Sequence, residues 1–219
     1  MTVSNGDFQT YFHRRAGRFA AFYSSEPVAR VLGRGPLFDR LRLAVETAVA
    51  LGAERVLDVG CGSGPLFAPL AAAGIHVTGI DPAPAMVELA RQQASLFPAL
   101  VEVDQRGWED VTEVDAYDLA VALGVFDYVG MPVDLLARMG RAAGHVVASF
   151  PSPGLRLRLR QIRYGARGVS VHGYGAYGFD RLALEAGMEV AEMFPLDRAG
   201  HVVHFRRRPP PTATGAGGP

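Results

Sequence analysis

The chain has 219 residues, enough for one domain with a substantial hydrophobic core. Its Lys and Arg residues together number 22 and balance 22 Asp and Glu residues, which gives no overall drive towards nucleic acid or an anionic membrane. Hydrophobic residues make up 49%, which excludes a disordered chain, and the single cysteine, Cys61, excludes an internal disulfide framework. With no secretory-signal pattern at the start and no apolar run near the roughly 20 residues that span a bilayer, we expect a cytoplasmic protein.

Aromatic residues recur through the N-terminal segment, residues 7–32, at the three- and four-residue spacing of one helix face. Gly35-Pro36 is then typical of a helix start, and the apolar stripe that follows ends at Gly52. Beyond it, strand-like and helix-period segments alternate. The predicted strands are 55–59, 75–80, 100–103, 118–123, 145–150, 189–194 and 201–206, and the predicted helices between them are 66–73, 84–96, 133–142, 154–164 and 179–186.

Strands interleaved with helices form βαβ units. They predict an α/β fold, a Rossmann-like open, mainly parallel seven-stranded sheet with helices on both faces, in residues 35–208. The last two strands are joined by a short link, residues 195–200, which predicts an antiparallel C-terminal hairpin. The composition of residues 209–219 predicts a disordered tail.

The stretch RVLDVGCGSGP, residues 55–65, places Asp58 before three alternating glycines, between the first strand and a helix. An open α/β sheet binds its ligand at this end of its strands. Asp81 ends the next strand about 21 residues past Gly60, the distance expected of a carboxylate that binds ribose hydroxyls. The spacing G-x-G-x-G differs from the dinucleotide fingerprint G-x-G-x-x-G, and Asp58 repels phosphate but suits an ammonium group. The loop therefore predicts a nucleoside-bearing ligand.

LDVGCGSG, with GIDP after the following strand, resembles the class I S-adenosylmethionine-dependent methyltransferases of the small-molecule type. The resemblance implies S-adenosylmethionine as cofactor, with Asp58 near its amino group and Asp81 on its ribose. The other cofactor contacts that it implies are Gly60, Cys61, Gly62 and Gly64 along the methionine and ribose, Pro82 and Met86 beside the adenine, Gly107 and Trp108 after the third strand, and Leu123, Gly124 and Val125 after the fourth.

The N-terminal stretch YFHRRAGRFAAFYSS resembles the lid helices of small-molecule methyltransferases, including those of quinone and porphyrin pathways. This resemblance makes residues 1–34 a helical lid and puts Tyr11, Arg18 or Tyr23 near the cofactor carboxylate. Core packing of amphipathic helices is the alternative.

The substrate side is expected in the N-terminal segment and in an insertion at about residues 151–178. Four arginines there, Arg156, Arg160, Arg163 and Arg167, share one face of a helix and are candidates for binding an anionic group; a solvated helix face is the alternative. The stretch GVSVHGYGAYG is typical of a binding loop. His172 and Tyr174 in it are the candidates for orienting or deprotonating the substrate.

We therefore expect an S-adenosylmethionine-dependent methyltransferase acting on a small molecule, with O-methylation favoured by the tyrosine, histidine and arginine content of the presumed pocket. The alternatives are cyclisation or rearrangement chemistry with the same cofactor, a cofactor-binding partner without activity, and a nicotinamide-dependent oxidoreductase, against which the glycine spacing argues. No Cys/His cluster has zinc-ligand spacing and no basic module is present. We expect no metal, no nucleic-acid partner and no membrane partner, and a monomer or homodimer.

Overall fold

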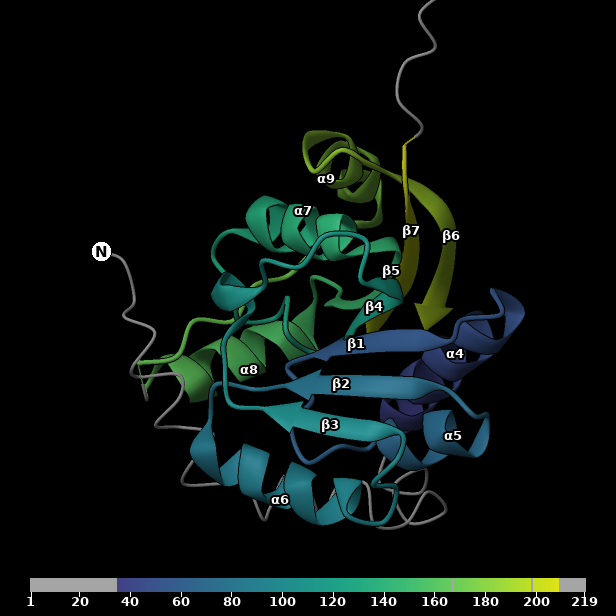
Figure 1. Cartoon of the computed structure of the whole chain (residues 1–219). Helices are drawn as coiled ribbons and strands as arrows, with labels where there is room; N and C mark the ends of the chain where they lie inside the picture. The colour runs from purple at the N-terminus through teal and green to yellow at the C-terminus, as the bar shows by residue number, and fades with distance from the viewer. Residues whose placement is uncertain (1–34, 167, 198, 209–219) are drawn as a thin grey trace, which may run out of the picture.

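The computed structural model describes residues 35–166, 168–197 and 199–208, which form a seven-stranded sheet of order β3-β2-β1-β4-β5-β7-β6 (Figure 1). The first five strands are parallel, and β7 is antiparallel to both of its neighbours. This confirms the predicted Rossmann-like sheet and its antiparallel C-terminal hairpin. The strands are β1 (Arg55–Val59), β2 (His76–Ile80), β3 (Val101–Asp104), β4 (Tyr117–Ala122), β5 (Ala143–Pro151), β6 (Met188–Leu196) and β7 (Gly200–Arg207).

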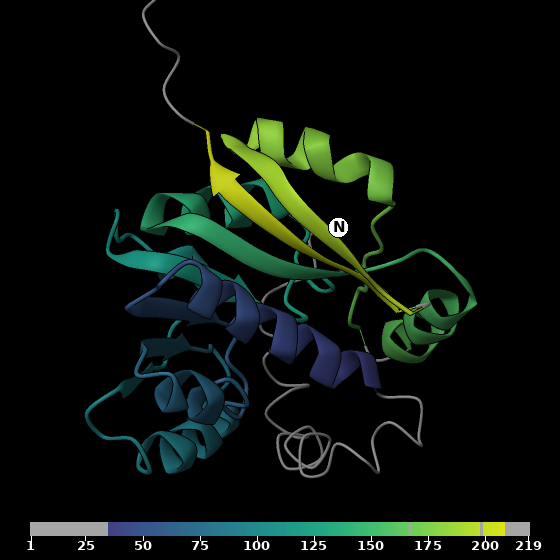
Figure 2. The ribbon, with the colours of Figure 1, turned by 90° about the vertical axis from the view of Figure 1, so that its right-hand side faces the viewer.

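Helices cover both faces of the sheet. Figure 2 shows α4 and α9 on opposite sides of the strands β5 and β7. The helices are α4 (Gly35–Ala50), α5 (Phe67–Ala72), α6 (Pro84–Ala94), α7 (Pro132–Ala142), α8 (Leu155–Gly165) and α9 (Phe179–Glu185), with 3₁₀ turns η2 (Trp108–Asp110) and η3 (Ala176–Gly178). Proline stands at the start of α6 and of α7, where its missing N–H costs no helical hydrogen bond.

Two hydrophobic cores lie on the two faces. Along β1, Val56 packs with α4, α5 and α6, whereas the next residue, Leu57, packs with α7 and α9. Successive strand residues point to opposite faces, so a strand covered on both sides is apolar throughout. The order of strands reverses between β1 and β4, which is the place where an open α/β sheet takes its ligand.

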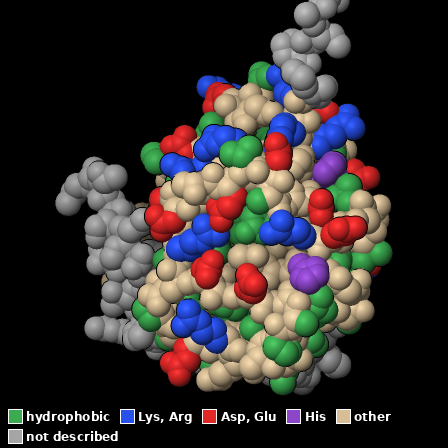
Figure 3. All heavy atoms as spheres, in the orientation of Figure 1, with side chains coloured by type: hydrophobic (Ala, Val, Ile, Leu, Met, Phe, Trp, Pro, Cys, Tyr) green, Lys and Arg blue, Asp and Glu red, His purple; other side chains and the backbone are tan. Residues whose placement is uncertain are grey.

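The N-terminal lid and the C-terminal tail that the sequence predicts lie outside the described residues. Among the helices that the structure describes, none is both long and apolar enough to cross a membrane. Acidic and basic side chains are interspersed over the face seen in Figure 3, as the balanced composition leads one to expect.

A histidine pair joins β5 to β7 across the antiparallel ladder. His145 Nδ1 and His204 Nε2 are 3.0 Å apart, so one ring must donate a proton and the other accept it. Burial lowers the pKa of His145, and the Arg206 guanidinium lowers it further. Burial also lowers the pKa of His204, as does His145, while Glu192 acts in the opposite direction. The fold therefore favours the uncharged pair.

We expect this pair to stabilise the fold at neutral pH and to lose that effect as pH falls from about 7.5 to about 5, because the unfolded chain binds protons that the folded chain resists. His204→Asn should lower the free energy of unfolding by about 1 kcal/mol at the upper pH and by less at the lower pH. Urea unfolding across this range measures the difference.

Buried carboxyls such as that of Asp58 also titrate in this range, and their effect on the free energy of unfolding has the opposite sign. That effect is the same in the wild type and in the variant, so it cancels in the difference between them. The matched control is His76→Asn, since His76 is exposed on β2. A deficit for His204→Asn that does not change with pH would contradict the role given to the pair.

Candidate functional site

The loop between β1 and α5 lies at the carboxyl end of β1 and is pinned to the end of β2. The backbone N–H groups of Gly60 and Cys61 both donate to the carbonyl oxygen of Ile80, at 2.8 and 3.0 Å. Gly60 has φ +68°, and a Cβ there would lie 2.5 Å from Val125 Cγ2, in the segment after β4. Gly62 has φ +57° with no atom within 4 Å of a Cβ, so its side of the loop is open. Glycine at position 60 thus allows close packing against Val125, and glycine at position 62 leaves the backbone accessible.

Two buried carboxylates lie under this loop. Asp81 is 9% exposed; its Oδ2 accepts from Gly62 N at 3.0 Å and its Oδ1 from Ala83 N at 2.8 Å. Burial raises its pKa against the effect of these two bonds. Asp58 is 3% exposed, and burial raises its pKa to about 7, helped by the charge of Asp81 and opposed by that of Arg40. Desolvated negative charge next to open backbone suits a cationic ligand that also carries hydroxyl groups.

Arg40 of α4 also reaches this place. A Cβ on Gly124 would lie 2.9 Å from Arg40 Nη1, so the guanidinium stands against the backbone just after β4. Gly124 is fixed there by its N–H, which donates to Ser149 Oγ at 2.8 Å. Arg40 is not among the residues predicted from the sequence, because it stands inside the apolar stripe of its helix. A charged residue within such a stripe is the signal that would have singled it out.

The remaining residues expected around the cofactor lie in different environments. Cys61 is buried in the core, and burial raises the pKa of its thiol, which fits a packing role. Met86 is buried with Ala83 at the start of α6, and Leu123 packs against the core on the α4 face. Tyr11, Arg18 and Tyr23 lie outside the described residues.

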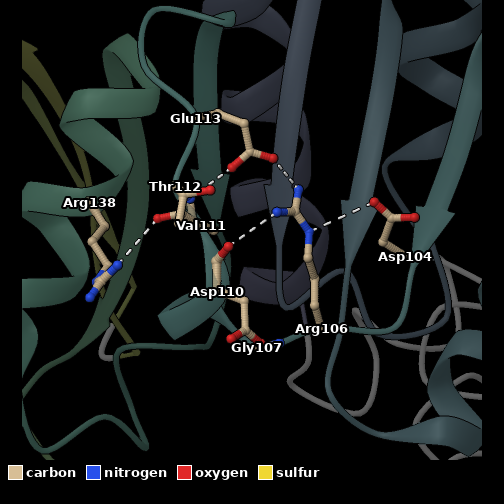
Figure 4. A network of polar contacts seen from close by, with 8 residues as sticks. All are labelled: Asp104, Arg106, Gly107, Asp110, Val111, Thr112, Glu113 and Arg138. Atoms are coloured by element: carbon tan, nitrogen blue, oxygen red, sulfur yellow. Dashed lines mark hydrogen bonds and ion pairs between the residues drawn. The ribbon is translucent and has the colours of Figure 1, made fainter.

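Polar contacts that were not predicted from the sequence organise the connection from β3 to β4 (Figure 4). Arg106 is at its centre: Nη2 is 2.5 Å from Glu113 Oε1 and Nη1 donates to the carbonyl oxygen of Asp110 at 3.3 Å. Gly107 N donates to Asp110 Oδ2 at 3.2 Å, and Trp108 packs half-buried against the core on the α7 face. Local hydrogen bonds and an ion pair thus hold residues 106–113, next to the ends of β2 and β3.

An ion pair ties α8 to the segment after β4. Arg160 Nη2 lies 2.7 Å from Oδ2 of the buried Asp127 and 3.1 Å from the hydroxyl oxygen of Tyr128. The expected arginine row is therefore divided between two environments. Arg160 is turned to Asp127, Arg156 and Arg163 are exposed on α8, and Arg167 lies outside the described residues.

The predicted binding loop lies over the ends of β4 and β5. His172 N donates to the carbonyl oxygen of Asp127 at 2.7 Å, and Tyr174 N to that of Pro151 at 2.9 Å. The Tyr174 hydroxyl donates to the carbonyl oxygen of Phe126 at 3.0 Å. Burial, with a smaller contribution from Asp127, raises the pKa of Tyr174 to about 12. The segment 124–128 touches the glycine loop through Val125 and the His172 loop through Asp127, so it joins the two halves of the site.

Comparisons with known proteins find likeness to methyltransferases. Residues 57–145 match the family model described as a methyltransferase domain. Among curated proteins, the chain is 36% identical over 110 residues to a ubiquinone biosynthesis O-methyltransferase of Methylobacterium nodulans, covering 49% of this chain and 40% of that protein. A protein of the same name from Azorhizobium caulinodans is 30% identical over 125 residues, covering 57% of this chain and 49% of its own. The chain spans about half the length of these relatives or less.

Solved structures extend the likeness to most of the chain. Magnesium protoporphyrin IX methyltransferase from Synechocystis PCC 6803, with bound SAH, has a TM-score of 0.77 at 21% identity, covering 94% of this chain and 100% of that one. Mitomycin 7-O-methyltransferase has a TM-score of 0.63 at 21% identity, covering 87% and 60%. At these identities the likeness establishes a shared fold. Residues 57–145 of this chain thus resemble a methyltransferase domain, and the described chain shares the Rossmann-like fold of these methyltransferase structures.

Proposed function

We propose that the protein is an S-adenosylmethionine-dependent methyltransferase that methylates an oxygen atom of a small molecule. The observation that carries this proposal is the pair of buried carboxylates, Asp58 and Asp81, beside a glycine loop whose backbone is open at Gly62. A ligand with an ammonium group and a ribose diol satisfies both acids. A dinucleotide would instead bring phosphate charge next to Asp58.

Named residues would hold each part of the cofactor. Asp58 pairs with the ammonium group, and Asp81 accepts hydrogen bonds from the ribose hydroxyls. Arg40 takes the carboxylate, a role for which Tyr11, Arg18 and Tyr23 remain further candidates. The backbone of Gly60, Cys61, Gly62 and Gly64 follows the methionine and ribose, and the adenine lies among Pro82, Met86, Gly107, Trp108, Leu123, Gly124 and Val125.

Bound in this way, the cofactor supplies a methyl group on an already activated sulfonium. The protein's own contribution is then mainly to align the acceptor and, for a hydroxyl, to accept its proton. We assign the proton to His172, which is half-buried at the site. Tyr174 is better suited to positioning, since its hydroxyl already donates to the carbonyl oxygen of Phe126 and its raised pKa keeps it protonated at neutral pH, where it cannot accept the proton.

The acceptor is a small molecule, and oxygen is favoured because the curated relatives are named O-methyltransferases. The four arginines Arg156, Arg160, Arg163 and Arg167 do not enter the proposal as one anion site. Arg160 is occupied by Asp127 and holds α8 in place. Detection of a methylated product alongside S-adenosylhomocysteine separates methyl transfer from rearrangement chemistry with the same cofactor.

We expect Asp81→Ala to weaken the binding of S-adenosylmethionine and S-adenosylhomocysteine by about 1 to 3 kcal/mol, or about 5- to 150-fold, because charge-assisted bonds to the ribose are lost. Isothermal titration calorimetry of the purified chain measures this, with NAD as the ligand control. Glu88→Ala, which removes an exposed carboxylate from α6, should leave the affinity unchanged. Unaltered affinity in Asp81→Ala would mean that the ribose lies elsewhere.

We also expect the affinity for S-adenosylhomocysteine to rise with pH between about 6 and 7.5, by up to about tenfold per unit, because Asp58 must be ionised to pair with the ammonium group. Burial favours the neutral carboxyl below its pKa of about 7, so binding at lower pH releases a proton. Calorimetry in buffers of different ionisation enthalpy detects that release. In Asp58→Asn the pH dependence should flatten; a wild-type affinity that stays constant over this range would exclude the pairing.

A further inference from the structure

The outward face of α8 carries an apolar stripe. Leu155, Leu159 and Ile162 are 74%, 59% and 72% exposed, and their spacing of four and three residues puts them in one line on the helix. The inward face of the same helix is also apolar. Leu157 and Tyr164 are buried there in a small core that is separate from the two main ones. The helix therefore has one apolar side inside the protein and another one outside it.

The outward stripe is flanked by positive charge. At 100° per residue, Arg156 and Arg163 lie along one side of it and Arg158 along the other. All three are exposed. No Asp or Glu occurs in α8, and the sequence has none at all between Asp134 and Asp180. In a chain whose total charge is zero, this is a local excess of one sign.

Neither a solvated helix face nor an anion-binding row accounts for this arrangement. A solvated face is polar, whereas the middle of this one is aliphatic. A row that binds an anionic substrate would share one environment, whereas Arg160 is paired with Asp127 and the guanidinium carbon of Arg163 lies 5.2 Å from the centre of the Tyr164 ring. Arg156 and Arg158 are exposed on the two sides of the aliphatic stripe. Figure 2 shows α8, the green helix at the right, standing apart from the layers of the sheet.

We propose that α8 docks on an anionic lipid surface, with its aliphatic stripe in the acyl boundary and its arginines on the headgroup phosphates. Helices that lie in a membrane interface have this pattern, an apolar face with Lys or Arg along its borders. Arginine suits it because a planar guanidinium binds phosphate through two parallel hydrogen bonds. The expectation of no membrane partner rested on the charge of the whole chain, and α8 departs from that average.

The ion pair between Arg160 and Asp127 gives the docked helix a fixed position on the protein. It joins α8 to the segment after β4, which also contacts the glycine loop. The carboxyl edge of the sheet is thereby held next to the lipid surface. If the proposed methyl transfer is correct, an acceptor that partitions into a bilayer would reach the His172 loop from that side; the docking itself does not depend on it.

Flotation of the full chain with vesicles, without cofactor or acceptor, tests the proposal. The two compositions are phosphatidylcholine alone and an equimolar mixture of phosphatidylcholine and phosphatidylglycerol. We expect binding to the mixed vesicles and background recovery with the neutral ones, weakening as salt is raised. Background recovery with both compositions at low salt would overturn the proposal.

Two double variants on α8 separate its apolar and charged contributions. Leu159→Ser with Ile162→Ser and Arg156→Glu with Arg158→Glu should each lower the partition coefficient by about tenfold or more. The matched controls are Leu184→Ser, which changes a 58% exposed leucine on α9, and Arg91→Glu, which reverses an exposed charge on α6. Circular dichroism and titration with S-adenosylhomocysteine check that every variant is folded.

The outcomes are distinct. Lipid binding by both α8 variants equal to that of the wild type would overturn the proposal. So would a homodimer in analytical ultracentrifugation that only the Leu159→Ser, Ile162→Ser variant dissociates, because the stripe would then be covered by a second copy. If the wild-type chain floats with the mixed vesicles but does not bind S-adenosylhomocysteine, the result counts against the proposed function and supports the docking surface.

Discussion

The burial of Asp58 and Asp81 at the ends of adjacent parallel strands is the constraint on which the rest of the site depends. Buried carboxylates are unfavourable unless they are hydrogen-bonded or paired, and Asp81 meets that need with the N–H groups of Gly62 and Ala83. The same two bonds fix the glycine loop and the entry to α6. Asp58 has less compensation, which its raised pKa reflects. The two acids thus form the buried polar centre for which we propose the ammonium group and ribose of the cofactor as partners.

From that loop a series of contacts leads to the proposed substrate side. Gly60 packs against Val125, which leaves no room for a side chain at position 60 and joins the loop to the chain after β4. Two residues on, Asp127 bonds to the His172 loop through its carbonyl oxygen and to Arg160 through its carboxylate. The position of α8 is therefore tied to the glycine loop, although the two are far apart in sequence and share no core.

The sequence predicted the fold well because strand and helix signals are local. The alternation of apolar strands with amphipathic helices determines the order of elements, and every described strand and helix lies within a few residues of its predicted range. The residues that were missed, Arg40, Arg106 and Asp127, act through contacts made across the sheet or through a turn. A single arginine in an apolar stripe reads locally as an exception, and only the packing of α4 against β4 and β5 shows that it reaches Gly124. The roles given to His172 and Tyr174 remain predictions.

The helix α8 shows why periodicity alone could not decide which face of a segment is buried. Its sequence, LRLRLRQIRYG, supplies one apolar stripe through Leu155, Leu159 and Ile162 and another through Leu157 and Tyr164. Tertiary contacts choose between them: the ion pair of Arg160 with Asp127 and the packing of Tyr164 with Val169 and Val171 turn the second stripe inward. Once that choice is made, three aliphatic side chains must face outward with arginine on both sides. An aliphatic surface bordered by arginine is unfavourable in water and favourable against anionic lipid. The contact of Arg160 with Asp127 therefore also turns outward the stripe that we propose as the docking face.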